Sequence, residues 1–158
     1  MAWNSSSRLL LAALLLTRLP YITAQSSGHL TVGTPAKISG ARAQAVQTKI
    51  PVAIDAGFHV NSNKPTEEYL IPLSVTWTAP GALEAGAVIY PKPVMETVAD
   101  KPLAVFTGKF DLIANFKVSA NAPAGPGVAA GKLKYQACNS TTCFPPKTVE
   151  ISVPYQVQ

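Results

Sequence analysis

Apolar and polar residues alternate strictly along the segment from residue 110 to residue 118. The apolar side chains occupy every second position, at Phe110, Leu112, Ala114, Phe116 and Val118. Because successive side chains of a β-strand point to opposite faces, this pattern predicts a strand with one buried face. Shorter strands are predicted in three segments, at residues 49–54, 69–77 and 103–106. Turns rich in Pro, Gly and Asn separate them, and no helical period follows residue 24, so the chain is expected to form an all-β sandwich.

Prolines shape two further expectations. Pro51 has no N–H to donate to a sheet, which favours an edge position or a strand start for the segment around it. Residues 87–102 contain three prolines and are expected to form a loop that exposes Tyr90, Val94 and Met95. Both expectations follow from the backbone chemistry of proline alone.

The only two cysteines of the chain, Cys138 and Cys143, lie between two alternating segments near the C-terminus. Apolar residues alternate with polar ones over residues 132–137 and again over residues 148–157. Four small polar residues separate the cysteines, and two alternating segments joined by such a loop predict a β-hairpin. The cysteines should then face each other across the mouth of the loop, within bridging distance.

The cysteine pair has two interpretations, a structural disulfide or a redox site. Closing a loop of about six residues stabilises a fold by only roughly 2 kcal/mol, less than a bond between segments distant in the chain. A hairpin mouth also leaves the sulfurs within reach of another thiol, as exchange requires. Pro145 and Pro146 keep the rim open to a partner, and Lys134 and Lys147 could favour a thiolate or be ordinary solvated residues.

The first 24 residues have the pattern of a secretory signal peptide. Arg8 provides a positive charge, Leu9–Leu16 is wholly apolar, Pro20 follows, and Ala24 is a suitable cleavage position. The apolar run is shorter than the roughly 20 residues that cross a bilayer, although an uncleaved anchor is the alternative interpretation. No later segment is apolar enough to span a membrane. Export would place the cysteines where disulfides form and persist.

Charge and composition exclude several classes of function. The chain has 13 basic side chains, of which Arg8 and Arg18 would leave with the signal peptide, and 8 acidic ones. This small excess without a basic cluster gives no basis for nucleic-acid binding. Two cysteines without adjacent histidines cannot complete a zinc site, and no Ser/His/Asp pattern indicates a hydrolase. His29 is expected to be solvated in a flexible lead over residues 25–45, and His59 is expected to have a structural role.

Two parts of the sequence resemble the N-terminal periplasmic domain family of the thiol:disulfide interchange protein DsbD. Tyr135-Gln-Ala-Cys138, the short polar loop and Cys143-Phe-Pro-Pro146 resemble the active hairpin of that family. The segment from Gly57 to Pro65, followed by Glu68-Tyr-Leu-Ile-Pro72, resembles the family's earlier signature. The resemblance covers residues 45 to 157 or so and is specific at the hairpin, where both halves of the motif occur together.

The resemblance implies an immunoglobulin-like β-sandwich over residues 46–158, with Cys138 and Cys143 as a redox pair. It implies protein-disulfide reductase-type activity in the periplasm without a cofactor. The electron donor would be thioredoxin-like or membrane-embedded, and the acceptors would be exported disulfide-containing proteins. The resemblance favours Cys138 as the cysteine that bonds to partners. It also places a cap over the sulfurs near residues 90–95, with Tyr90 as a candidate aromatic.

The sequence departs from the family pattern in two respects. Its loop between the cysteines is slightly shorter than in well-known members. Those members also continue into a membrane-embedded part and a thioredoxin-like domain, so a free-standing module would need a separate protein as its donor. The alternative is a β-sandwich that binds other proteins and keeps the disulfide only as a structural staple.

Overall fold

A computed structural model describes residues 25–26, 28–78, 81–98 and 100–158. The predicted signal peptide, residues 1–24, lies outside the described residues. Within the described part, all regular structure is β-strand, and no helix is long and apolar enough to cross a membrane. The strands are β1 (Gln25–Ser26), β2 (Leu30–Val32), β3 (Ile38–Gly40), β4 (Ala45–Ile54), β5 (His59–Asn61), β6 (Ser74–Trp77), β7 (Leu83–Ile89), β8 (Val94–Val98), β9 (Lys101–Phe106), β10 (Lys109–Val118), β11 (Gly125–Tyr135), β12 (Ala137–Cys138) and β13 (Lys147–Val157).

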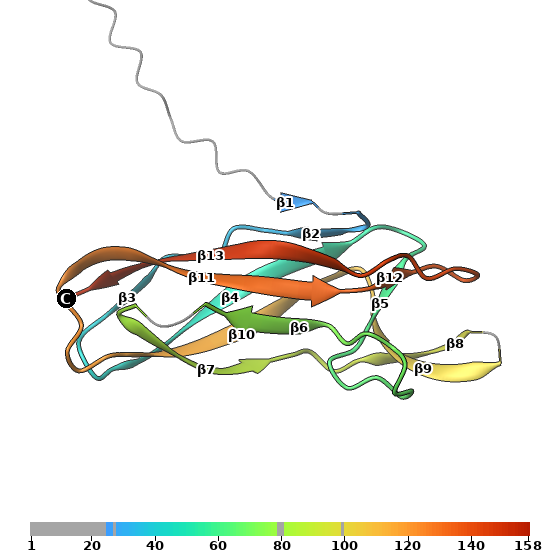
Figure 1. Cartoon of the computed structure of the whole chain (residues 1–158), viewed down its shortest axis with the longest axis horizontal. Coiled ribbons are helices and arrows are strands. Elements are labelled where there is room, and N and C mark those ends of the chain that lie inside the picture. Colours follow the sequence, from blue (N-terminus) through green and yellow to red (C-terminus); the bar gives the residue numbers. More distant parts are fainter. Residues whose placement is uncertain (1–24, 27, 79–80, 99) are drawn as a thin grey trace, which may run out of the picture.

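The strands form three sheets (Figure 1). One sheet has the order β1-β2-β4-β10-β7, and a second, with the order β3-β13-β11-β6, packs against it as the other layer of a sandwich. A third sheet, β12-β5-β9-β8, lies at the end of the molecule opposite the C-terminus. All strand pairs are antiparallel except β13 with β3. The predicted all-β sandwich is confirmed.

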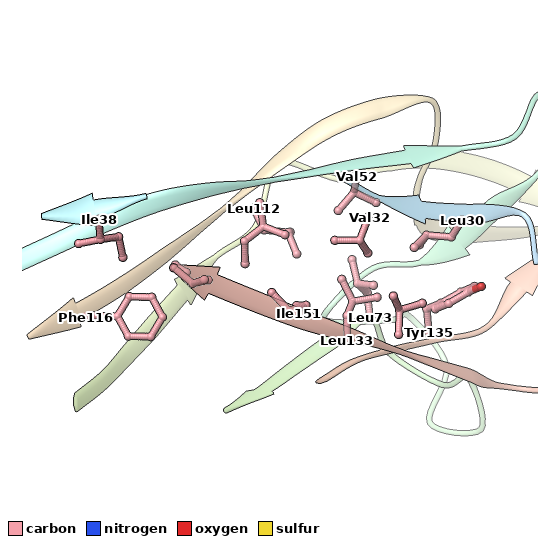
Figure 2. Close-up of a cluster of buried hydrophobic side chains, with 14 of the residues drawn as sticks. Leu30, Val32, Ile38, Val52, Leu73, Leu112, Phe116, Leu133, Tyr135 and Ile151 are labelled. Atoms are coloured by element: carbon pink, nitrogen blue, oxygen red, sulfur yellow. The ribbon is translucent and has the colours of Figure 1, made fainter. Parts of the chain in front are cut away.

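The core lies between the two large sheets and follows from the alternation in sequence. In β10, Leu112, Ala114, Phe116 and Val118 are all buried, as their spacing predicts. Figure 2 shows side chains of the two layers meeting, among them Leu112, Leu133 and Ile151. A fully buried Leu or Ile contributes roughly 1.5–3 kcal/mol relative to an exposed one. The burial of several such residues outweighs the roughly 2 kcal/mol gained from a short-loop disulfide, so the core contributes more to the stability of the fold than the disulfide does.

The sandwich begins earlier in the chain than the sequence pattern suggests. Residues 25–45 were expected to form a flexible lead with at most one edge strand, but they contain β1, β2 and β3. Leu30, Val32 and Ile38 are buried in the main core. These isolated apolar residues lie in a segment rich in small and polar residues, and their burial comes from pairing with β4 and β13. The β-sandwich, which was expected to start at residue 46, therefore includes strands that lie before that residue.

Residues 87–102 are also more regular than expected. The segment contains the end of β7, which pairs with β10, and all of β8, which forms a hairpin with β9. Among the described residues of this segment, strand structure is missing at residues 90–93, which contain Pro91 and Pro93, and at Asp100, which lies in a turn. The side chains of β8 are all exposed or half-buried, so it has no buried face and no apolar alternation that sequence analysis could detect.

Pro51 lies in an interior strand, not at an edge or a strand start. β4 has β10 on one side and β2 on the other, but the pairing with β2 ends at Val32 and Val52. The carbonyl oxygen of Pro51 accepts a hydrogen bond from the Gly33 N–H at 2.8 Å, just beyond that end. The N–H and C=O of one strand residue point to the same side. The missing N–H therefore faces the end of β2, so the pairing of β4 with β10 is left intact while the β2 ladder stops at this point.

Candidate redox site at the cysteine hairpin

Cys138 and Cys143 form a disulfide at the tip of the hairpin that joins β11 to β13. The two residues pair across the loop, with their Cα atoms 4.0 Å apart. The structure thus brings together the two cysteines as the hairpin pattern predicts. Figure 1 shows this tip extending beyond β12, at the end of the sandwich where β5, β8 and β9 lie.

The loop between the cysteines makes its own turn. The side-chain oxygen of Asn139 accepts hydrogen bonds from the N–H groups of Thr141, at 2.9 Å, and Thr142, at 2.8 Å. The Asn139 N–H donates in turn to the carbonyl oxygen of Thr142 at 2.9 Å. Asn side chains favour such local turns, which compete with regular secondary structure. The turn directs the chain back so that Cys143 meets Cys138.

The two cysteines differ in exposure. Cys138 is 1% exposed, because β12 pairs with β5 in the third sheet. Cys143 is exposed, and the residues on either side of it are not part of any strand. The hairpin closes beneath it through the Phe144 N–H, which donates to the carbonyl oxygen of Ala137 at 2.9 Å. Only the Cys143 side of the disulfide is open to an external thiol.

His59 lies directly opposite Cys138 in the pairing of β5 with β12. Its side chain is buried, and its Nδ1 atom lies 3.4 Å from Oε2 of Glu96 in β8. Its other ring nitrogen, Nε2, is buried and has no hydrogen-bond partner among the described residues. Burial lowers the pKa of His59 from its ordinary value, and the Glu96 carboxylate opposes this in part.

The structure therefore brings His59 and Glu96 together with the cysteine pair. Sequence analysis treated His59 as structural because no second histidine, cysteine or acidic cluster stands near it in sequence. It did not single out Glu96, which lies in the segment expected to be a loop. The only signal for His59 was its place in the family-like segment from Gly57 to Pro65. No sequence signal pointed to Glu96.

A group of aromatic rings lies beside Cys143. The His29 ring stacks on Phe58, with ring centroids 3.6 Å apart, and lies 5.2 Å from the ring of Phe144. The Nδ1 atom of His29 lies 3.2 Å from Oδ2 of Asp55. His29 is thus half-buried and paired, not freely solvated as its sequence context suggested. A cavity of 260 Å³ is lined by His29, Phe144 and Lys147, among other residues.

Tyr90 does not take the place of a cap over the disulfide. It is half-buried, and its hydroxyl oxygen accepts a hydrogen bond from the Val75 N–H at 3.2 Å. Its ring lies parallel to that of Phe106, with centroids 6.5 Å apart, and burial raises its pKa. Both contacts hold Tyr90 against the core of the sandwich. Glu96 in β8, just after the expected cap region of residues 90–95, reaches His59 instead.

The described residues contain no group of three His, Cys, Asp or Glu side chains that could hold a metal ion. The arrangement is instead suited to thiol chemistry. It combines a disulfide whose two cysteines differ in exposure with a buried imidazole on the residue paired with the buried cysteine. Lys147 lines the cavity beside His29 and Phe144, whereas Lys134 lies on the exposed face of β11.

Comparison with known proteins agrees with this chemistry. The family described as "Thiol:disulfide interchange protein DsbD, N-terminal" matches residues 29–154. The N-terminal periplasmic domain of ScsB from Proteus mirabilis has a similar fold, with 15% sequence identity and a TM-score of 0.57. That match covers 80% of this chain and 47% of the other, so the chain spans about half of that structure.

A second solved structure is less similar. The reduced N-terminal domain of DsbD from Neisseria meningitidis has 18% identity and a TM-score of 0.44, with 70% of this chain and 82% of that chain covered. A search of curated proteins gave no significant match. The fold is an immunoglobulin-like β-sandwich, as the resemblance implied. Because the family match covers most of the chain, both cysteines included, the chain belongs to the family of the N-terminal domain of the thiol:disulfide interchange protein DsbD.

Proposed function

We propose that this chain is an exported thiol:disulfide interchange module that passes electrons to partner proteins through Cys138 and Cys143. The observation that carries the proposal is the disulfide at the hairpin tip, with Cys138 buried and Cys143 exposed. Exchange requires access to one sulfur and a second thiol held close behind it. A disulfide with a purely structural role would not need one accessible sulfur and one protected sulfur.

The difference in exposure gives the order of the steps. In the reduced form, the Cys143 thiolate attacks a partner's disulfide, and one partner sulfur leaves as a thiolate that takes up a proton. Cys138 then attacks Cys143, breaks the mixed disulfide and releases the second partner sulfur. Two electrons and two protons pass to the partner, and the internal disulfide forms again. This order is the reverse of the one that the family resemblance favoured, because Cys138 is buried.

The partners follow from the same chemistry. A thioredoxin-like or membrane-embedded donor would reduce the Cys138–Cys143 bond, and exported proteins with disulfides would be the acceptors. Membership in a family of periplasmic domains and the signal-like residues 1–24 support a periplasmic location. The exchange reaction is protein-disulfide reductase-type chemistry and needs no cofactor, since the electrons move with the sulfur–sulfur bonds.

The test is the equilibrium reduction potential of the disulfide, measured in a glutathione or dithiothreitol series. We expect a value between about −180 and about −270 mV, where exchange proteins lie. A variant in which serine replaces both cysteines is the control and should show no transition. A bond that stays oxidised below about −300 mV would contradict the proposal. The protein-binding module with a structural disulfide would then be the better interpretation.

A further inference from the structure

The second step of the proposed exchange requires a base near Cys138. The thiolate, not the thiol, attacks a disulfide, and burial disfavours the charged form of a thiol. Cys138 is buried, so bulk water has little access to its proton. A group inside the protein must therefore take this proton when Cys138 resolves the mixed disulfide.

His59 lies where such a base would be needed. In an antiparallel pair, side chains directly opposite each other lie on the same face, with Cβ atoms about 4.5–5.5 Å apart. His59 and Cys138 form such a pair, and His59 is only 4% exposed. The buried Nε2 atom has no hydrogen-bond partner among the described residues. Buried polar atoms without partners are rare in native proteins and call for an explanation.

Glu96 favours the tautomer of His59 that can accept a proton. Its carboxylate lies 3.4 Å from Nδ1 and stabilises a proton on that nitrogen. The lone pair is then on Nε2. His59 and Glu96 line a cavity of 380 Å³ together with Ser140, which belongs to the loop between the cysteines. The cavity therefore lies between this pair and the loop that joins the two cysteines.

The other groups around His59 do not compete for this role. Val105 and Phe106 are the residues of β9 that pair with β5, and both are apolar. Asp55 is the remaining charged residue in the cavity lining, and its carboxylate lies 3.2 Å from His29. Among the described residues that face His59, Glu96 is the charged group next to the ring and Cys138 is the thiol opposite it.

We propose that His59 accepts the proton of the Cys138 thiol during resolution of the mixed disulfide, with Glu96 as the positioning residue for its ring. The proposal deepens the proposed function and rests on its order of steps. His59 Nε2 takes the proton, and the Cys138 sulfur attacks Cys143 as the bond between Cys143 and the partner breaks. The electron pair leaves with the partner sulfur, which takes the proton back from the imidazolium. The partner disulfide is the only oxidant.

The two steps can be followed separately with a dithiobis(nitrobenzoate) reagent, which releases one coloured thiolate at each step. Attack by Cys143 on the reagent gives the first phase, and attack by Cys138 on the resulting mixed disulfide gives the second. With the full chain reduced beforehand and freed of reductant, His59→Gln should leave the first phase unchanged in stopped flow. It should slow the second phase about 100-fold near neutral pH, at the lower end of general-base effects. The second phase of the variant should then rise with pH as the thiol itself ionises.

A second variant keeps the test independent of any effect of His59→Gln on folding. Glu96 is partly exposed, and Glu96→Gln should slow the second phase by about 10-fold, as expected for a residue that acts through another. Glu150→Gln is the matched control, because Glu150 is also paired at the surface, with Lys132, but lies on β13 away from His59. It should change neither phase.

Three outcomes would count against the inference. A second phase with the wild-type rate and pH profile in His59→Gln would overturn it while leaving the proposed function intact. An equal loss of both phases in the two site variants would indicate a structural role and would also overturn it. If the wild-type protein released thiolate from neither cysteine, the pair would not exchange, and the proposed function would fail with the inference.

Discussion

The hydroxyl group of Tyr135 donates a hydrogen bond of 2.6 Å to the carbonyl oxygen of Gly28, a residue 107 positions earlier in the chain. Tyr135 is the last residue of β11 and is buried, whereas Gly28 precedes β2 and has a φ of 68°, where glycine is favoured. This bond ties the N-terminal segment to the base of the cysteine hairpin. His29, the next residue, then packs on Phe58 beside the site.

Tyr135→Phe removes this hydrogen bond without changing the ring. We expect the free energy of unfolding to fall by about 1 kcal/mol, the usual net contribution of one such bond. Denaturant unfolding of the oxidised protein measures the change. Tyr69→Phe removes a hydroxyl from an exposed tyrosine and should have little effect. Equal stabilities of the two variants would show that the bond to Gly28 contributes nothing.

The single-cysteine variants should differ in reactivity. Cys138→Ser leaves the exposed Cys143, which should form a lasting mixed disulfide with glutathione disulfide because no second thiol can release it. Cys143→Ser leaves the buried Cys138, which should react far more slowly. Mass spectrometry of the intact protein counts the adducts over time. Equal rates in the two variants would contradict the proposed order of exchange.

Gly131 has no room for a side chain. A Cβ atom at this position would lie 2.6 Å from Cε3 of Trp77 and 3.2 Å from the backbone oxygen of Thr76. Gly131→Ala should therefore reduce the free energy of unfolding by about 1–3 kcal/mol, as overpacking does. In Gly81→Ala, the nearest atom to the new Cβ is the Tyr155 hydroxyl oxygen at 3.4 Å, which is an ordinary contact. Thermal unfolding should distinguish the two variants clearly.

The core should depend on Leu133 far more than on Val128, an exposed residue of the same strand. Leu133 is 0% exposed in β11, and Leu133→Ala should reduce the free energy of unfolding by about 2–5 kcal/mol through lost burial and a cavity. Val128, also in β11, is 60% exposed, and Val128→Ala should change stability by less than about 0.5 kcal/mol. Similar losses in urea unfolding would contradict the placement of the core.

Stability should fall at mildly acidic pH because of His59. Burial lowers the pKa of His59 in the folded state below its ordinary value of 6.5, so between the two values the unfolded chain binds more protons. The contribution of the neutral His59 ring to the free energy of unfolding is therefore fully present above pH 6.5. It is lost as the pH falls through the lowered pKa of the folded state. His59→Gln should flatten this part of the curve of unfolding free energy against pH. If the curve of His59→Gln had the same shape as that of the wild-type protein, His59 would not be the cause of the loss of stability.

Local pattern was enough to predict several elements. The alternation from Phe110 to Val118 corresponds to β10, and the two alternating segments around the cysteines form the β11–β13 hairpin. The close spacing of Cys138 and Cys143 was sufficient to predict their bond. Each of these features depends on residues near one another in the chain. Short strands without a buried face, such as β8, have no such pattern and could not be predicted in this way.

The arrangement of the candidate site depends instead on the pairing of strands that are distant in the chain. The family resemblance favoured Cys138 as the reactive cysteine, but its pairing with β5 buries it and leaves Cys143 exposed. The same pairing places His59 opposite Cys138, and the β8–β9 hairpin brings Glu96 to the ring. Periodicity in a sequence shows which face of a strand is apolar, but not which distant strand will pair with it or in what register. The longer strands with one buried face and the cysteine pair can therefore be derived from local sequence. The difference between the two sulfurs, and the imidazole behind one of them, arises only from contacts between distant segments.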